Sequence, residues 1–412
     1  MILNGKPFDN GLGGEVGLAD RTKQCEASVD EHRRSKILFL GVTFLYWIAL
    51  YLYVPTLPVY VKAKVTNLST VGFVLSMYGL MMALARIPMG IVADAIGRGK
   101  RLIVAGIFLT IAGAIIMGSG NTIPVLVAGR ALTGLSAATW VVLIVVFSTF
   151  FEADKVIFAS ALLTFSSSIG RMAATASTGF LNRAGGYSLA FYTAGLCGLI
   201  AILLVLLVKE DRRPPMQVSL RSVVQLFLRR DVLLPTMISI VVHYADWGVT
   251  FGFLPILAQE MGMGDVMKSL LISLNIAGIT IANLLNTLLL KKVRHGALLV
   301  AGTMFCFIGI ILIAYSPSIA YLFTGTVCMG FSFGIVYPIL VGSSIQEVDR
   351  TQRSTAMGMH QAFYAIGMFM GPWLSGIIAD RIGIRPTFYL TAGVYLILML
   401  FLLRLLARRT RP

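Results

Sequence analysis

The chain is organised as long apolar runs separated by short polar segments. Twelve of these runs approach or exceed the roughly 20 residues that an α-helix needs to cross a hydrocarbon core of about 30 Å. They lie at 37–60, 69–93, 101–119, 122–147, 157–181, 187–208, 232–258, 266–290, 296–315, 318–343, 354–379 and 386–406. Many contain Gly, Pro, Ser or Thr, which is common in membrane helices that pack against one another. The pattern predicts an all-α integral membrane protein with twelve transmembrane helices.

The composition excludes the water-soluble classes of protein. Hydrophobic residues make up 57% of the 412 positions, and charged residues make up 13%, against roughly 25% in an average soluble domain. A soluble globule of this composition could not cover its surface with polar side chains. Disorder is excluded as well, because so apolar a chain can bury more than enough surface to offset the entropy of ordering.

The basic residues predict how the chain is oriented in the membrane. The formal net charge is +16, from 34 Lys and Arg against 18 Asp and Glu. If the N-terminus is cytoplasmic, 25 of the 34 lie on the tails and cytoplasmic connections, six lie outside, and three lie within spans. Such a bias follows the positive-inside rule. We therefore expect both termini in the cytoplasm of a bacterial cell (inner) membrane, and no nucleic-acid partner.

A faint internal repeat divides the chain into two halves. Offsetting the sequence by 197 residues superimposes matching landmarks: Leu57-Pro58 on Leu254-Pro255, Gly179 on Gly376, Gly186 on Gly383, and Phe191-Tyr192 on Phe388-Tyr389. Two pseudo-symmetric six-helix bundles are predicted. Parallel repeats of this kind place a substrate site between the halves, near the middle of the membrane.

The repeat and the charge pattern together predict five segments. These are a flexible cytoplasmic tail over 1–36, an N-terminal bundle over 37–208, a basic cytoplasmic linker over 209–231, a C-terminal bundle over 232–406 and a second cytoplasmic tail over 407–412. Within the linker, the stretch Val218–Arg230 has the apolar and basic residues of a short helix lying in the membrane interface.

A loop motif follows the second predicted span. The sequence there is Gly90-Ile-Val-Ala-Asp94-Ala-Ile-Gly97-Arg98-Gly-Lys100-Arg101. Gly90 permits close helix approach, Asp94 can accept hydrogen bonds from a helix N-terminus, Gly97 suits a tight turn, and the bases suit the inner leaflet. This segment resembles the loop signature of the major facilitator superfamily. The resemblance implies that Asp94 and Arg98 belong to a gate, with Gly90, Gly97 and Arg101, that latches the halves in an outward-open state.

Three further segments bear on the branch of that family. The paired prolines Pro55 and Pro58 are similar to a segment of the drug:proton antiporter branch, and Arg130 followed by Gly134 is similar to the helix-4 arginine motif of proton-coupled members. The fifth span departs from the exporter pattern, because the stretch around Gly170 contains no proline. The resemblance therefore implies the fold more strongly than the direction of transport.

A carboxyl group within the seventh span is the predicted proton-coupling site. Charges inside a membrane are costly and usually face a partner or a wet cavity. Asp246 is the acid deepest within a span, and it shares a helix face with His243, Trp247 and Thr250 at i, i+3, i+4 and i+7 spacing. Asp246 and His243 are therefore expected to carry the proton. The alternative is a structural pair, with Arg or His, that only joins helices.

The predicted substrate site combines embedded arginines with aromatic and polar side chains. Arg171 lies on a polar stripe of the fifth span with Thr164, Ser167, Thr175 and Thr178, a spacing that suits a cavity wall. The full set predicted to bind substrate is Arg130, Arg171, Trp247, His360, Gln361, Tyr364 and Tyr46. Alternatives remain open: Arg171 could serve structure alone, Arg130 could extend to the interface, and His360 could be a hydrogen-bonded packing residue. For Arg86 the structural role is favoured.

These features predict a secondary active transporter that works by alternating access. The leading hypothesis is proton-coupled export of a small organic compound, anionic or amphiphilic, because three arginines and one acid leave the spans positive. The alternatives are uptake of an organic anion, flipping of a lipid head group, or a non-transporting sensor on this fold. No phosphate-binding loop, zinc-ligand spacing or nucleophile motif is present, so we expect no enzyme activity, cofactor or metal. The expected partners are the substrate, protons and membrane lipid, and the expected state is a monomer.

Overall fold

The computed structural model describes residues 33–152, 155–210, 229–290, 292–348 and 353–409. Most of the predicted N-terminal tail, the predicted interfacial helix and the last three residues lie outside these ranges. The N-terminal half contains a first helix Arg33–Tyr51, then α2 (Leu57–Lys62), α3 (Leu68–Ile96), α4 (Gly99–Ser119), α5 (Ile123–Ala137), α6 (Trp140–Ser148) and α7 (Val156–Leu207). The C-terminal half contains α9 (Arg230–Gly248), the π-helix η2 (Val249–Phe253), α10 (Leu254–Glu260), α11 (Asp265–Leu289), α12 (His295–Tyr315), α13 (Ile319–Gln346), α14 (Arg353–Ile382) and α15 (Ile384–Arg409).

The prediction of twelve transmembrane helices is confirmed. Eleven continuous stretches of the described chain are long and apolar enough to cross a membrane. One of them, α7, contains two crossings, because the chain turns at Gly185 and Gly186. Gly186 has φ 72°, a left-handed conformation that only glycine adopts readily, and this sharp turn matches the predicted end of one span and start of the next. Every predicted span overlaps one crossing.

Corresponding spans of the two halves are interrupted at the same place. In the first span the regular helix stops at Tyr51 and α2 begins with Pro58 in its first turn. In the seventh span η2 follows Gly248, and α10 begins with Pro255 in its first turn. Proline lacks a backbone N–H and fits the start of a helix, so each one restarts the helix after the break. The two prolines are partners in the 197-residue repeat.

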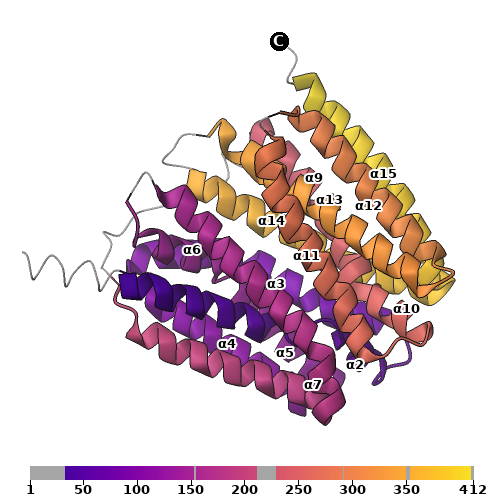
Figure 1. Cartoon of the computed structure of the whole chain (residues 1–412), viewed down its shortest axis with the longest axis horizontal. Coiled ribbons are helices and arrows are strands. Elements are labelled where there is room, and N and C mark those ends of the chain that lie inside the picture. Colours follow the sequence, from indigo (N-terminus) through magenta and orange to yellow (C-terminus); the bar gives the residue numbers. More distant parts are fainter. Residues whose placement is uncertain (1–32, 153–154, 211–228, 291, 349–352, 410–412) are drawn as a thin grey trace, which may run out of the picture.

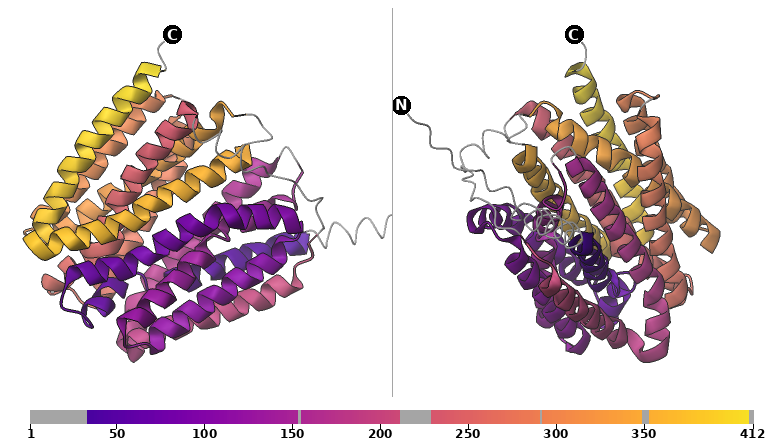
Figure 2. Two further views of the ribbon diagram at one scale, coloured as in Figure 1. Left: turned by 180° about the vertical axis from the view of Figure 1, so that it is seen from behind. Right: turned by 60° about the vertical axis from the view of Figure 1, so that its left-hand side comes forward.

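The two bundles meet at one end of the molecule and diverge toward the other (Figures 1 and 2). We call the end that carries Arg33 and Arg409 the terminal end, and the opposite end the far end. At the far end α3 of the first half packs against α14 of the second, and α7 packs against α11. Glycines permit this contact: a Cβ atom at Gly79 would lie 2.5 Å from the backbone nitrogen of Phe369, and one at Gly376 would lie 2.6 Å from the carbonyl oxygen of Leu68.

Carboxylates at two helix N-termini complete the far-end closure. The side chain of Asp380, at the end of α14, accepts hydrogen bonds from the backbone N–H groups of Leu68 (2.5 Å) and Ser69 (2.9 Å), which begin α3. On the other side, Asn182 of α7 donates to Asp265 (3.0 Å), which begins α11. A negative charge is favourable at a helix N-terminus, where N–H groups lack intrahelical partners. Both contacts join one half to the other.

Replacing Asp380 with alanine is expected to loosen the far end. The variant loses both hydrogen bonds to α3, and because the site is exposed we expect about 1 kcal/mol, or roughly a fivefold shift toward conformations open at the far end. Distances between spin labels on the far ends of α3 and α14 would measure this shift. Asp380→Asn, which keeps one acceptor oxygen, should have a smaller effect, and Arg381→Ala is the neighbouring control. An unchanged distance distribution in Asp380→Ala would contradict the role of the carboxylate.

Candidate functional site

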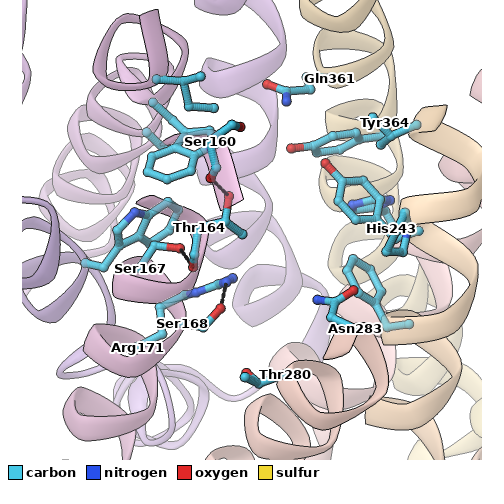
Figure 3. A pocket seen from close by; sticks show the side chains of 18 of the residues that line it. Ser160, Thr164, Ser167, Ser168, Arg171, His243, Thr280, Asn283, Gln361 and Tyr364 are labelled. Atoms are coloured by element: carbon cyan, nitrogen blue, oxygen red, sulfur yellow. Dashed lines mark hydrogen bonds between the residues drawn. The ribbon is translucent and has the colours of Figure 1, made fainter. Parts of the chain in front are cut away.

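A cavity of about 590 Å³ lies between the two bundles (Figure 3). Its walls come from the first helix, α3, α5, α6 and α7 on one side and from α9, α11, α13 and α14 on the other. The lining continues to Ser160, Thr287, Gly342 and Met357, all near the terminal end of their helices. Because the far end is closed by contacts between the halves, the cavity opens toward the terminal end.

The first half of α7 presents a polar stripe to this cavity. Ser160, Thr164, Ser167, Ser168 and Arg171 all line it, and Figure 3 shows them along one face of the helix. The spacing of hydroxyl residues in the sequence therefore identified a real wall of the cavity.

Two members of the predicted stripe lie beyond the cavity, toward the far end. Thr175 is 2.9 Å from the hydroxyl of Ser273, and Thr178 donates to the carbonyl oxygen of Leu52 at 2.7 Å. Here α7 is already packed against α11 and the first helix, so the same face that lines the cavity near the terminal end is buried between helices.

Arg171 is held between aromatic rings but has few hydrogen bonds. Its Cζ atom lies 5.0 Å from the ring centroid of Trp47 and 5.7 Å from that of Tyr51. One Nη atom donates to the Ser168 hydroxyl at 3.3 Å, and the buried Nε atom has no hydrogen-bond partner. The ion pairs found among the described residues do not involve Arg171. Its charge therefore faces the cavity without an acidic partner from the described residues.

Aromatic side chains form the opposite wall. His243 stacks on Tyr364 with ring centroids 4.0 Å apart, and its ring meets Phe333 and Tyr337 edge-on. The Nδ1 atom is 2.8 Å from the carbonyl oxygen of Ser239. A carbonyl only accepts, so Nδ1 carries the hydrogen and Nε2 is left as a hydrogen-bond acceptor.

A pair of side chains joins the halves within the cavity. Arg86 of α3 donates from Nε (3.1 Å) and from an Nη atom to the amide oxygen of Gln361 on α14, and from its other Nη atom to the carbonyl oxygen of Ala137 (3.3 Å). Both Arg86 and Gln361 line the cavity. The favoured structural role of Arg86 fits these contacts, although the residue also contributes a positive charge to the wall.

Tyr46 and His360, both predicted to bind substrate, do not line the cavity. The Tyr46 hydroxyl donates to the carbonyl oxygen of Ser136 at 2.7 Å, which joins the first helix to α5. The two ring nitrogens of His360 lie 3.0 Å from the hydroxyls of Thr236 and Ser239. Both side chains are buried with their polar atoms satisfied. In this conformation they join helices and do not line the cavity, and their contact with substrate stays a prediction.

Arg130 lies behind the cavity wall. Its side chain is 2% exposed, and its Cζ atom is 4.4 Å from the ring centroid of Tyr78. Tyr78 in turn stacks on Trp247 of the other half at 5.2 Å, and these two rings line the cavity. Arg130 is thus separated from the cavity by Tyr78, so direct contact with substrate is not available to it here. Its Nε and one Nη atom have no hydrogen-bond partner.

The predicted helix face that carries Asp246 is split by the cavity. His243 and Trp247 line the cavity, whereas Asp246 and Thr250 point into the packed interior of the second half. Asp246 is 4% exposed, one of its carboxyl oxygens has no hydrogen-bond partner, and no hydrogen bond to His243 is found among the described residues. The direct pairing of these two residues is therefore not present. The π-helix η2 begins three residues after Asp246, and such segments recur at functional sites.

The segment predicted to form a gate lies at the terminal end, between α3 and α4. Gly97 ends α3 with φ 63°, as the predicted tight turn requires, and Arg98 and Arg101 are exposed beside it. A Cβ atom at Gly90 would meet nothing within 4 Å, so the close helix approach expected there is not formed. The side chain of Asp94 lies outside the described set. The missing contact at Gly90 agrees with a cavity that opens at this end, and the role of this segment as a gate stays a prediction.

Several cavity residues were not predicted as site residues. Trp140, Tyr78 and Tyr337 line the cavity with the predicted set. Each is a single aromatic residue in an apolar run, and nothing in its spacing distinguishes it from an aromatic residue that faces lipid. Asn283 also lines the cavity, whereas the neighbouring Asn275 and Asn286 of α11 donate to carbonyl oxygens of α13, as expected for residues that join helices.

Comparison with known proteins identifies the family. The sequence matches the model of the Major Facilitator Superfamily twice, over residues 39–238 and 236–412. The chain belongs to the major facilitator superfamily. Multidrug resistance protein 2 of Bacillus subtilis is 24% identical over 385 residues, which cover 86% of this chain and 90% of that protein. The resemblance to the drug-antiporter branch is confirmed at this level, and the protein is a secondary transporter rather than an enzyme.

Solved structures share the fold of this transporter. The nucleoside transporter NupG has a TM-score of 0.74 at 15% identity, with 90% of this chain and 98% of that one covered. A bacterial homologue of the human lysosomal transporter Spinster, solved in an inward-facing and unoccupied conformation, has a TM-score of 0.75 at 13% identity, with 92% and 97% covered. At these identities the similarity establishes the twelve-helix fold in two bundles.

Proposed function

We propose that this transporter exports a small organic, anionic or amphiphilic compound from the cytoplasm in exchange for protons, by alternating access. In the proposed orientation both termini are cytoplasmic, as the distribution of Lys and Arg indicates, so the terminal end faces the cytoplasm. The structure then corresponds to the inward-facing step, in which the cavity loads substrate. A monomer in the cell membrane would suffice, because both halves of the site come from one chain.

The observation that carries this proposal is the arrangement of the cavity between two closable ends. The far end is closed through Gly79, Gly376 and Asp380, whereas at the terminal end a Cβ atom at Gly90 would meet nothing within 4 Å. Rocking of one bundle against the other would exchange the two sets of contacts and expose the cavity on the other side. A sensor that does not transport would have no need for such paired contacts.

The buried carboxyl of Asp246 supports the coupling to protons. It lies on the same helix as His243 and Trp247, which line the cavity, and three residues before the start of the π-helix η2. A rearrangement of this irregular backbone would carry Asp246 between the packed interior and the wet cavity. Its proton would then be held in one conformation and released in the other.

Export is favoured by the relative that covers the chain and by the first span. Multidrug resistance protein 2 matches 86% of this chain, and the Pro55–Pro58 segment is similar to drug antiporters. Uptake of an organic anion would use the same cavity with net flux in the opposite direction. Export and uptake can therefore be distinguished only by the direction of a driven flux.

Proton-coupled transport can be tested in proteoliposomes that contain a pH-sensitive dye. Addition of a transported compound is expected to move protons across the membrane, in the direction opposite to the compound, and only in vesicles that contain the protein. The measurement is the rate of change of dye fluorescence, with a protonophore as control. Flux of a labelled compound without any movement of protons would contradict the coupling, and movement of both in the same direction would contradict export.

A further inference from the structure

We propose that Arg171, with the aromatic rings that hold it, is an anion subsite, and that the substrate is an organic monoanion with a flat apolar body. This inference rests on the proposed function, because it assumes that the cavity is the substrate site. Among the charge classes that the cavity could hold, the proposed substrate is an anion, and the side chain that recognises it is Arg171.

The contacts of Arg171 leave the edge of its guanidinium group available. Trp47 and Tyr51 lie 5.0 and 5.7 Å from its Cζ atom, so ring contacts hold the group in place. A guanidinium group has five N–H donors in one plane, and the hydrogen-bond partners found among the described residues are the hydroxyls of Ser168, at 3.3 Å, and Tyr51, which leaves donors unused. A group held by aromatic rings with unused donors at its edge is prepared to bind an oxyanion through two parallel hydrogen bonds.

The charge balance of the cavity favours one negative charge on the substrate. The described cavity lining contains two arginines and no Asp or Glu. Arg86 is 2% exposed, and its three nitrogens are bonded to Gln361 and Ala137. Arg171 is therefore the cationic side chain with donors to spare. A positive charge in an apolar, partly dehydrated cavity is stabilised by an anion and repels a cation.

The surroundings of Arg171 indicate the rest of the molecule. The Trp47 ring lies 5.3 Å from Trp140, edge to face, and the facing wall carries Trp247 and Phe333. Flat rings pack favourably on such surfaces, and a cavity of about 590 Å³ is within the usual range for small-molecule sites. A carboxylate or sulfonate on an aromatic body would bring the anion to Arg171 and the rings to the tryptophans.

The test is equilibrium binding to the full-length protein in lipid nanodiscs, at one pH and without a gradient. Three probes of similar shape are compared: 1-naphthylacetate, its neutral amide 1-naphthylacetamide, and the cation 1-naphthylmethylammonium. Trp47 and Trp140 lie beside the subsite, so quenching of tryptophan fluorescence reports binding. The anion is expected to bind more tightly than the amide by about 10- to 100-fold, the range for hydrogen bonds to a charged group, and the cation is expected to bind most weakly.

Variants of Arg171 separate recognition of charge from general damage. Arg171→Gln should lower affinity for the naphthylacetate anion about 10- to 100-fold and leave affinity for the amide unchanged. The affinity of Arg171→Lys for the anion should lie between those of the wild type and Arg171→Gln, because lysine keeps the charge but lacks the planar donors. Arg183→Gln is the matched control, since Arg183 is an exposed arginine on the same long helix.

Two results would overturn the subsite. One is equal or tighter binding of the amide or the cation to the wild-type protein, which requires no variant and so does not depend on folding. The other is an equal loss of anion and amide binding in Arg171→Gln. The binding test uses no pH gradient, so selective binding of the anion would support the subsite even if transport proved independent of protons. Conversely, proton-coupled transport of cations would contradict the subsite without contradicting proton-coupled transport.

Discussion

Replacing Gly79 with valine is expected to remove the inward-facing conformation from the transport cycle. A Cβ atom at this position would lie 2.5 Å from the backbone nitrogen of Phe369 and 2.6 Å from the carbonyl carbon of Met368. Those atoms belong to the backbone of α14 and cannot turn aside as a side chain could. Overpacking of this kind typically costs about 1–3 kcal/mol, which corresponds to a roughly 5- to 150-fold loss of the closed far end. Transport should fall accordingly.

The expected signature of Gly79→Val is a change of conformation with the fold retained. The nearest atoms to an added Cβ all belong to the other half, so each bundle can still fold. Spin-label distances at the far end should lengthen, and uptake into vesicles should slow. Gly113→Val is the contrasting variant, because Gly113 contacts Gly129 within the first half and should lower the melting temperature instead. Gly393→Val, which meets no atom within 4 Å, should change neither. Transport at the wild-type rate by Gly79→Val would contradict the proposed closure.

The fold could be predicted because the solvent constrains it. A lipid-facing chain must satisfy its backbone within each helix, so an apolar run of sufficient length predicts a crossing. Even the reversal within α7 was expected, since Gly185 and Gly186 interrupt an otherwise continuous apolar stretch. The paired breaks before Pro58 and Pro255 follow from the chemistry of proline, which is local in the sequence.

The site could be predicted only in part, because hydropathy does not fix how each helix is rotated about its axis. The i, i+4 pair of His243 and Trp247 faces the cavity as expected, but Asp246, on the edge of the same predicted face, is turned into the second bundle. His360 and Gln361 are adjacent in sequence, and only the latter lines the cavity. A rotation of tens of degrees separates the two outcomes, and it is set by packing against neighbouring helices.

Contacts between the halves could not be predicted from the sequence. Asp380 and Leu68 are separated by 312 positions, and no local pattern indicates that one caps the helix that the other begins. The conformation was equally inaccessible: the loop motif around Gly90 indicates a latch, but not whether that latch is closed. Gly79, for example, is an ordinary small residue of a membrane helix in the sequence, and it acquires a role only because the backbone of the opposite half lies against it.

Asp246→Asn is expected to abolish transport driven by a pH gradient while substrate exchange remains measurable. The substitution keeps the shape of the side chain but removes the group that takes up and releases the proton. Asparagine can still hydrogen-bond within the interior of the second bundle, near Thr250, so the fold should persist. An alternating-access carrier that cannot exchange its proton should still exchange labelled for unlabelled substrate, because that reaction requires only rocking of the loaded protein.

The comparison that decides the role of Asp246 is between driven flux and exchange in the same vesicles. If Asp246 only joined helices, its loss would destabilise the protein and reduce both rates together. If it carries the proton, driven flux disappears and exchange stays within a few-fold of the wild type. Glu260→Gln is the matched control, because it neutralises an exposed carboxyl group at the end of the same interrupted span. Driven flux that survives in Asp246→Asn would contradict this role and favour other titratable groups, beginning with His243, which lines the cavity and whose Nδ1 atom is 2.8 Å from the carbonyl oxygen of Ser239.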